Sequence, residues 1–283
     1  MNKSTSALFI VAATLSLTAC KSEEGNEKKD APLKQGVIEV DTTDVFHSDQ
    51  YEFVLPRPFA LAASFEEAGL KFDAGRMNSL ENLENYKTEG KQLLNFGVYS
   101  TDLVYTIIND QPQLSIKYFE GIKKLADKIG MGKIFTEDEL ALKIEKNIAD
   151  REMMEDLLID VHEKSQEYLQ NNQMRYLTAI QFAGAWIEGM YLASFDILGK
   201  DPKIIGHKVA DHMTLLKNTI QGLEAYKDRD QDLQEVLDAL KGLQETYNNL
   251  SSVQKAKGIP DLSMADIQII EDEIRKIRTL IVA

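Results

Sequence analysis

The sequence has few cysteines, which can cross-link a fold, and few prolines, which interrupt secondary structure. It contains one cysteine, Cys20, and six prolines in 283 residues. A single cysteine cannot form a disulfide within the chain, so the core must be stable without one. Alternating apolar and polar runs are scarce, whereas apolar residues recur at helical spacing over most of the chain, which predicts an all-α fold with minimal sheet.

The sequence also lacks an excess of positive charge. It has 32 Lys and Arg against 46 Asp and Glu, which gives a formal net charge of -14 at pH 7. Such a chain repels nucleic acid phosphates, and no basic cluster offsets that charge. We therefore expect no nucleic acid partner.

Motifs for metals and catalysis are missing as well. No histidine has a glutamate three positions before it, as the di-iron Glu-x-x-His motif requires, and H-E-x-x-H, G-x-S-x-G and a glycine-rich phosphate loop do not occur. Residues 228–232 imitate the start of a calcium loop, but Leu233 and Ala239 replace the glycine and glutamate that the loop needs. We expect no metal, no cofactor and no catalytic residue, which favours a protein that is not an enzyme.

The first twenty residues have the pattern of a targeting signal. Lys3 supplies a positive start, residues 7–17 are apolar or small, and Leu17-Thr18-Ala19-Cys20 resembles the lipobox of bacterial lipoproteins. In that family the cysteine thiol receives a diacylglyceryl group and the bond before it is cleaved. The resemblance implies a cleaved signal peptide at 1–19 and Cys20 as the lipid anchor to a membrane. The alternative is an ordinary secretory signal that ends in cysteine.

Residues 20–50 are polar and charged, which predicts a flexible tether that carries the lipidated cysteine. Lys21 and the two glutamates at 23 and 24 resemble the export signals of lipoproteins displayed on the surface of some Gram-negative bacteria. We expect anchoring in the outer membrane, with display on its outer face as a further expectation. Residues 51–283 then form a single all-helical domain, which begins with a short extended strap at 51–55.

Start and stop signals place the helices of that domain. Ser79, Thr88, Pro112 and Pro202 mark starts, and Gly130 marks an end. The gaps are short, so neighbouring helices should be antiparallel, in a multi-helix bundle or an array of helical hairpins. The predicted ranges are about 58–69, 80–86, 88–108, 112–129, 137–147, 151–170, 176–195, 202–223, 233–250 and 267–281.

The stretch from Tyr176 to Phe195 carries one formal charge, Glu188, so a helix here needs apolar neighbours on every side. We expect the buried central helix of the bundle. A membrane span is the alternative, but Gln181 and Glu188 would both be costly in lipid. Small residues at every fourth position share one face of this helix and would let another helix approach closely. They are Ala185, Gly189 and Ala193.

The chain contains one internal echo, that is, a weak internal repeat of two similar segments. A shift of 86 residues places Asn95 over Gln181 and Asp102 over Glu188, so that an amide and a carboxylate recur seven residues apart. We expect an internal duplication in which the helices around 88–108 and 173–198 face each other. A structure with these helices far apart would contradict it.

The two carboxylates are also the candidate functional residues, because a buried carboxylate is costly unless it is paired. In one interpretation they belong to a buried polar network. In the other they converge in a ligand pocket between the two echoing helices. The candidate residues are Asn95, Tyr99, Asp102, Gln181, Trp186 and Glu188.

Three segments resemble a family of uncharacterised all-helical lipoproteins of Gram-negative bacteria: Leu-Pro-Arg-Pro-Phe at 55–59, Phe-Gly-Val-Tyr-Ser-Thr-Asp-Leu at 96–103 and Ala-Gly-Ala-Trp-Ile-Glu-Gly at 183–189. The similarity spans most of residues 50–225. It implies an envelope localisation and a helical fold, and it implies no activity.

The sequence therefore favours a non-catalytic binding or scaffolding module of the cell envelope, anchored to the outer membrane through Cys20. Its partner would be an envelope protein or a small molecule. The alternative is a ligand-binding or metal-binding helical bundle, with hydrolytic activity as a variant, whose carboxylate-lined pocket lies between the helices around 88–108 and 173–198.

Overall fold

Side-chain caps and prolines set where the helices begin in the computed structural model of the protein. Thr88, Asp230 and Ser263 each accept a hydrogen bond from the backbone N–H three residues ahead, which satisfies a donor in the first helical turn. Pro112 and Pro202 begin their helices, where a missing N–H costs nothing. The structure describes residues 45–47, 52–54, 72–136, 140–171, 174, 176–194 and 202–283. All of them belong to the second of two units into which the chain divides, Val37–Ala283.

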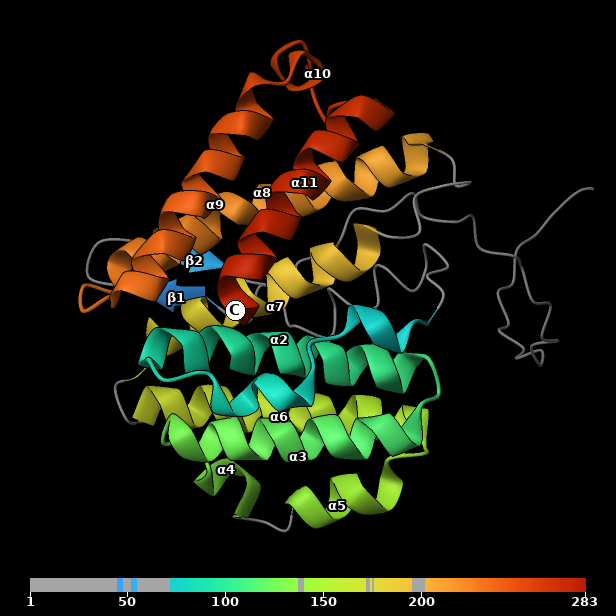
Figure 1. The fold of residues 1–283 in the computed structure, drawn as a ribbon, viewed down its shortest axis with the longest axis vertical. Helices are drawn as coiled ribbons and strands as arrows, with labels where there is room; N and C mark the ends of the chain where they lie inside the picture. Colours follow the sequence, from blue (N-terminus) through green and yellow to red (C-terminus); the bar gives the residue numbers. More distant parts are fainter. Residues whose placement is uncertain are drawn as a thin grey trace, which may run out of the picture. The chain divides into compact units, whose positions relative to one another are not determined.

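The fold is an all-α multi-helix bundle, as the sequence predicts (Figure 1). Two 3-10 helices precede the α-helices and form the turns from Asp73 to Tyr86. The elements are η1 (Ala74–Arg76), η2 (Leu80–Glu84), α2 (Glu89–Ile108), α3 (Pro112–Lys128), α4 (Lys133–Thr136), α5 (Leu140–Asn147), α6 (Arg151–Asn171), α7 (Tyr176–Ala193), α8 (Pro202–Ala225), α9 (Gln231–Asn249), α10 (Ser251–Gln254) and α11 (Met264–Val282).

The predicted helices agree closely with the observed ones where both can be compared. The predicted ranges 88–108 and 151–170 differ from α2 and α6 by one residue at one end. Two short helices, α4 and α10, were not predicted. α4 winds one turn that buries Ile134 and Phe135, a pattern too short to show a helical period. The predicted helix at 58–69 lies outside the described residues.

The largest contact in the bundle joins α2 and α7. A Cβ on Gly97 would lie 1.9 Å from the carbonyl oxygen of Gln181, and one on Gly184 would lie 1.9 Å from that of Leu94. Only glycine fits at these two positions, because the backbones of the two helices touch there. Ala185, from the predicted small-residue face, also lies in this contact, since its backbone N is 2.7 Å from the Cβ position of Gly97.

The contact between α2 and α7 is the arrangement that the internal echo required. The Thr101 hydroxyl donates to the carbonyl of Ala185, 84 residues later, at 3.1 Å. Gly97 meets Gln181 at the same sequence separation, so the two helices run in the same direction and pair at nearly the shift of 86 found in the sequence. The duplication itself remains a hypothesis, and its two helices do lie against each other.

Both helices of this pair are buried, so the predicted central helix is one of two. Sixteen of the twenty residues of α2 are buried, and α7 buries nearly every described side chain. No helix in the described residues is both long and apolar enough to cross a membrane. The bulky ridge of α7 consists of the buried residues Phe182, Trp186 and Met190.

The remaining helices pack around this pair. α3 lies along α2, and α5 and α4 lie against α6, in the lower part of Figure 1. α11 packs against α9, α7, α8 and α2, and its end, marked C in Figure 1, lies beside α2. One face of this last helix is a stripe of buried isoleucines: Ile267, Ile270, Ile274, Ile277 and Ile281.

Two three-residue strands form the described part of the chain before Phe72. β1 (Val45–His47) and β2 (Glu52–Val54) pair antiparallel, with Val45 opposite Val54, and β2 contacts α8. The strap predicted at 51–55 thus contains three residues in extended conformation. Its proposed role as the lead into the first helix remains a prediction, because residues 55–71 lie outside the described residues.

Candidate functional site

Glu188 is paired with Arg278 inside the bundle. The side chain of Glu188, on α7, is 0% exposed, and that of Arg278, on α11, is 13% exposed. Arg278 donates from Nε to Oε2 at 2.9 Å and from Nη2 to Oε1 at 3.1 Å. Its guanidinium also lies 4.3 Å from the centre of the Tyr191 ring, a cation–π contact. Arg278 thus forms a bidentate ion pair with the buried carboxylate, which offsets the free-energy cost of burying its charge.

Asp102 lies next to this pair on α2 and is fully buried. Its Oδ2 accepts a hydrogen bond from the backbone N of Asn78 at 3.1 Å. Its Oδ1 has no hydrogen-bond partner among the described residues, and the nearby Glu188 raises the pKa of Asp102. Two neighbouring buried carboxyl groups do not both ionise, because like charges in a buried site repel each other, so one of them keeps its proton.

The charges around the two acids decide which one carries the proton. Burial raises the pKa of Asp102 well above its usual value, and the neighbouring Glu188 raises it further. Burial also raises the pKa of Glu188, but Arg278 opposes this effect with its charge and its hydrogen bonds. Glu188 is therefore the ionised acid and Asp102 the neutral one, and the three groups together carry no net charge.

Asn78 connects this cluster to Tyr86 and to the helices α2 and α3. Its side-chain amide donates to the Tyr86 hydroxyl at 2.9 Å and to Asn95 Oδ1 at 3.1 Å. Its carbonyl accepts from the Tyr118 hydroxyl at 2.8 Å. The turn before α2 is therefore fixed to α2 and α3 by buried hydrogen bonds, and it completes the environment of Asp102.

The end of the chain is attached to the same cluster. The side-chain amide of Asn95 donates to the carbonyl of Ile281 at 2.8 Å, and Lys91 donates to that of Ala283 at 3.2 Å. These bonds satisfy the carbonyl groups of Ile281, in the last turn of α11, and of Ala283, which follows that helix; carbonyls at a helix end lack partners within the helix. Together with Arg278, they hold the last helix against α2 and α7.

Three tyrosines line one side of the cluster. The ring centres of Tyr86 and Tyr118 lie 6.4 and 6.0 Å from that of Tyr99, whose hydroxyl donates to Ser79 O at 2.7 Å. Burial raises the pKa of each of the three phenols. They therefore stay protonated and act as hydrogen-bonding groups, because a buried phenolate would be strongly disfavoured.

The structure brings together four of the six predicted site residues: Asn95, Tyr99, Asp102 and Glu188. Gln181 is separate, since its amide lies 3.1 Å from the sulfur of Met131, to which it donates. Trp186 is fully buried, and its indole Nε1 has no partner among the described residues. The amide and carboxylate that echo each other are thus joined in one network on α2, but not on α7.

This arrangement stabilises contacts between helices more readily than it binds a ligand. Protein groups occupy the positions around both carboxylates, and neither carboxylate reaches the surface. No group of three or more His, Cys, Asp or Glu residues is placed to hold a metal ion in the described part of the chain. The cluster offers no exposed nucleophile or base, and its chemistry is that of a buried polar network with no net charge.

Sequence reasoning missed the partner that matters most, Arg278. One signal pointed to it, because Arg278 lies four residues after Ile274 and three before Ile281, on the buried face of α11. A basic residue on such a face needs an acid opposite, and Glu188 was the acid without a partner. Asn78 had no signal, since it lies in an irregular turn with no period.

Comparisons with known proteins add no family. No protein-family profile, no curated protein and no solved structure matches the chain.

Proposed function

We propose that the protein is a helical lipoprotein of the outer membrane that binds or scaffolds other envelope components and performs no chemistry at its buried acids. The observation that carries the second part is the burial of Glu188, which is 0% exposed and held by two hydrogen bonds from Arg278. A carboxylate in this state is neither open to a substrate nor free to accept a proton.

The membrane part of the proposal rests on the Leu-Thr-Ala-Cys motif at 17–20. We expect Cys20 to carry the acyl groups. Cells that express the full chain are fed an alkyne-tagged palmitate, and the protein is examined for the tag and for its membrane fraction. Cys20→Ala should lose the tag and leave the outer membrane fraction, whereas Ser22→Ala should behave like the wild type. A tag that persists in Cys20→Ala contradicts the anchor.

Display on the outer face can be tested on the same cells. A protease added to intact cells removes a lipoprotein from the surface but spares one that faces the periplasm. Loss of the protein under these conditions, with a periplasmic marker left intact, supports surface display. Survival of the protein places it on the inner face and leaves the lipid anchor untouched as a proposal.

The non-catalytic part is tested by the access of reagents to the two acids. A carbodiimide with a small amine modifies carboxylates that solvent reaches, and mass spectrometry of peptides reports each position. We expect Asp102 and Glu188 to remain unmodified in the native protein, while the exposed Glu235 is modified. Modification of Glu188 at the rate of Glu235 would mean an open pocket and would favour the hydrolytic alternative.

A further inference from the structure

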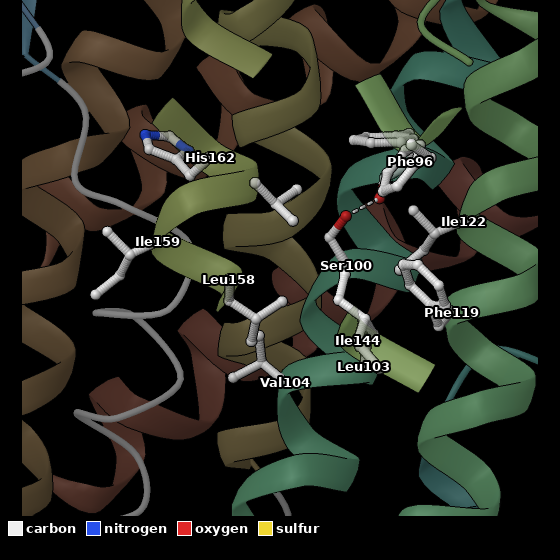
Figure 2. A pocket seen from close by; sticks show the side chains of 12 residues that line it. Phe96, Ser100, Leu103, Val104, Phe119, Ile122, Ile144, Leu158, Ile159 and His162 are labelled. Atoms are coloured by element: carbon white, nitrogen blue, oxygen red, sulfur yellow. Dashed lines mark hydrogen bonds between the residues drawn. The ribbon is translucent and has the colours of Figure 1, made fainter. Parts of the chain in front are cut away.

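A cavity lies against α2, and none of the residues of the carboxylate cluster lines it (Figure 2). It has a volume of about 100 Å³ and is lined by residues of α2, α3, α4, α5 and α6. Ten of its twelve lining side chains are apolar (Figure 2). The two polar ones are Ser100 and His162. A single water needs roughly 10 to 15 Å³ of such space, so the cavity is large enough for a group of several heavy atoms.

The polar groups of the wall offer little to water. The Ser100 hydroxyl donates to the carbonyl of Phe96, one turn earlier in the same helix, at 2.7 Å, as the dashed line in Figure 2 marks. His162 belongs to α6, at the side of the cavity opposite Ser100 in the same view. A water inside needs two to four polar partners, which the ten apolar side chains do not provide. The cavity therefore suits an apolar occupant.

The walls differ in burial, and this difference gives the cavity an open side. Leu103, Ile122 and Ile144, from α2, α3 and α5, are buried. Leu158 and His162, from α6, are half-buried. α6 makes its largest contact with α5 and smaller ones with α4, α2 and α7. Apart from Ser100, the half-buried residues of the wall all belong to α6, so α6 forms the more solvent-accessible side of the cavity.

We propose that this cavity binds the end of a hydrocarbon chain, an alkyl or acyl tail whose polar head remains outside at α6. An apolar, partly open cavity of this size accepts several methylene groups and leaves a longer molecule's head in water. The proposal deepens the binding role proposed above and rests on it, because it names the class of ligand. A free fatty acid and a membrane phospholipid share this chemistry.

The first test is a series of straight-chain carboxylates from butanoate to decanoate, titrated by calorimetry into the full chain with Cys20→Ala, so that no attached lipid competes. Each methylene that enters the cavity should raise the affinity about fourfold, and the rise should stop when the cavity is full. Affinity that does not depend on chain length overturns the proposal. Failure of the proposed lipid anchor would be seen only in the palmitate experiment. It can therefore be distinguished from failure of the proposed cavity ligand, which this titration measures.

The second test fills the cavity. In Ser100→Leu the new side chain occupies the space, and the lost hydroxyl had bonded only within its own helix, so the variant should melt no lower than the parent. Its affinity for decanoate should fall about tenfold or more. Ser100→Ala is the matched control, because it removes the same hydroxyl and leaves the space empty, and its affinity should stay within about twofold. Equal binding by Ser100→Leu and Ser100→Ala overturns the proposal.

A final comparison identifies the source of the tail. Vesicles of phosphatidylethanolamine and phosphatidylglycerol are mixed with the same Cys20→Ala chain and sedimented. Cosedimentation that Ser100→Leu abolishes identifies a membrane lipid as the donor of the tail. Decanoate binding without such cosedimentation identifies a free amphiphile, and both results support the proposed chemistry. The proposal is overturned if decanoate does not bind and if Ser100→Leu cosediments with the vesicles as strongly as the parent does.

Discussion

Arg278 and Glu188, which lie 90 residues apart in the sequence, form a bidentate ion pair with donor–acceptor distances of 2.9 and 3.1 Å. The pair joins the last helix to one of the two central helices. Removing the cation leaves an ionised acid in the core, which destabilises a protein far more than replacing both partners does. We expect Arg278→Met to lower the free energy of unfolding by about 3 to 5 kcal/mol, measured by urea denaturation at pH 7.

An exposed ion pair on the same helix provides the control. Lys276 lies 2.7 Å from Glu273, with side chains 68% and 29% exposed. Lys276→Met should change stability by less than about 1 kcal/mol, because water screens this pair. The double variant Glu188→Gln with Arg278→Met should lose less than the sum of its single variants. Equal effects of Arg278→Met and Lys276→Met would mean that the buried pair contributes no more than a surface one.

The neutral state of Asp102 predicts that an amide can replace it. In Asp102→Asn the side-chain oxygen can still accept from the backbone N of Asn78, and the side-chain nitrogen supplies a neutral donor beside Glu188. We expect Asp102→Asn to be at least as stable as the wild type at pH 8. Glu188→Gln should be destabilised by about 2 to 4 kcal/mol, because it leaves Arg278 without a charged partner.

The stability of Asp102→Asn and that of the wild type should also depend differently on pH. The pKa of Asp102 is raised by folding, so its favourable contribution is complete below the unfolded value near 4 and is lost as pH rises through the folded value. The stability of Asp102→Asn relative to wild type should therefore increase by up to about 1.4 kcal/mol per pH unit above pH 4, until the folded pKa is passed. Denaturation curves from pH 4 to pH 9 measure this difference. A constant difference would mean that Asp102 is ionised in the folded state.

An acid with the opposite shift provides the control for that experiment. Burial alone would raise the pKa of Asp266, but hydrogen bonds from Ser263 lower it. Its contribution is therefore present above the unfolded pKa and is lost as pH falls through the folded one. Asp266→Asn should lose about 0.5 kcal/mol at neutral pH, an amount reduced by its contact with solvent, and should match wild type at low pH.

Replacement of Glu271 by glutamine is expected to stabilise the protein. This residue of α11 is 8% exposed, its Oε1 has no partner among the described residues, and burial raises its pKa to about 7. The stability it allows is complete below the unfolded pKa near 4 and is lost as pH rises through 7. Glu271→Gln should raise the free energy of unfolding by about 1 to 2 kcal/mol at pH 8 and by little at pH 4. Equal changes at both pH values would assign the gain to packing instead of charge.

Much of the fold could be predicted because helix ends are encoded locally. Ser79 caps η2 with its own side chain, and Pro112 and Pro202 begin α3 and α8. The burial of α7 also followed from composition, since a helix with one charge has no face for solvent. Such signals depend only on residues within one or two turns of each other.

The candidate site depended on contacts that are distant in sequence, and prediction was less complete there. Glu188 could be selected because it is the lone charge of its helix, and Asp102 because it is the counterpart of Glu188 in the internal echo. Arg278, which lies 90 residues after Glu188, could be connected to it only by the packing of α11 on α7. Gln181 was assigned to the network by its echo of Asn95, but the turn of α7 directs it to Met131. A pattern along one helix indicates which residues share a face, and the neighbouring helix decides what that face meets.

The backbone contact between α2 and α7 gives the last prediction. A methyl group at Gly97 would lie 1.9 Å from a carbonyl oxygen of α7, and one at Gly184 would lie 1.9 Å from a carbonyl oxygen of α2. Neither neighbour is a flexible side chain, so the helices must separate to accept the methyl group. We expect Gly97→Ala and Gly184→Ala each to destabilise the protein by about 2 to 4 kcal/mol, because separation of the helices also loosens the packing around Asp102.

The same substitution has the opposite expected sign in α9. Gly242 lies within that helix, and a Cβ there would have no atom within 4 Å. Gly242→Ala should stabilise the protein by about 0.5 to 1 kcal/mol, because alanine loses less backbone entropy than glycine in a helix. Urea denaturation of the three variants separates the cost of the close approach from the general preference for alanine. A gain at Gly97 as large as that at Gly242 would mean that α2 and α7 are not in backbone contact in solution, and the pairing that brings Asp102 to Glu188 would have to be abandoned with it.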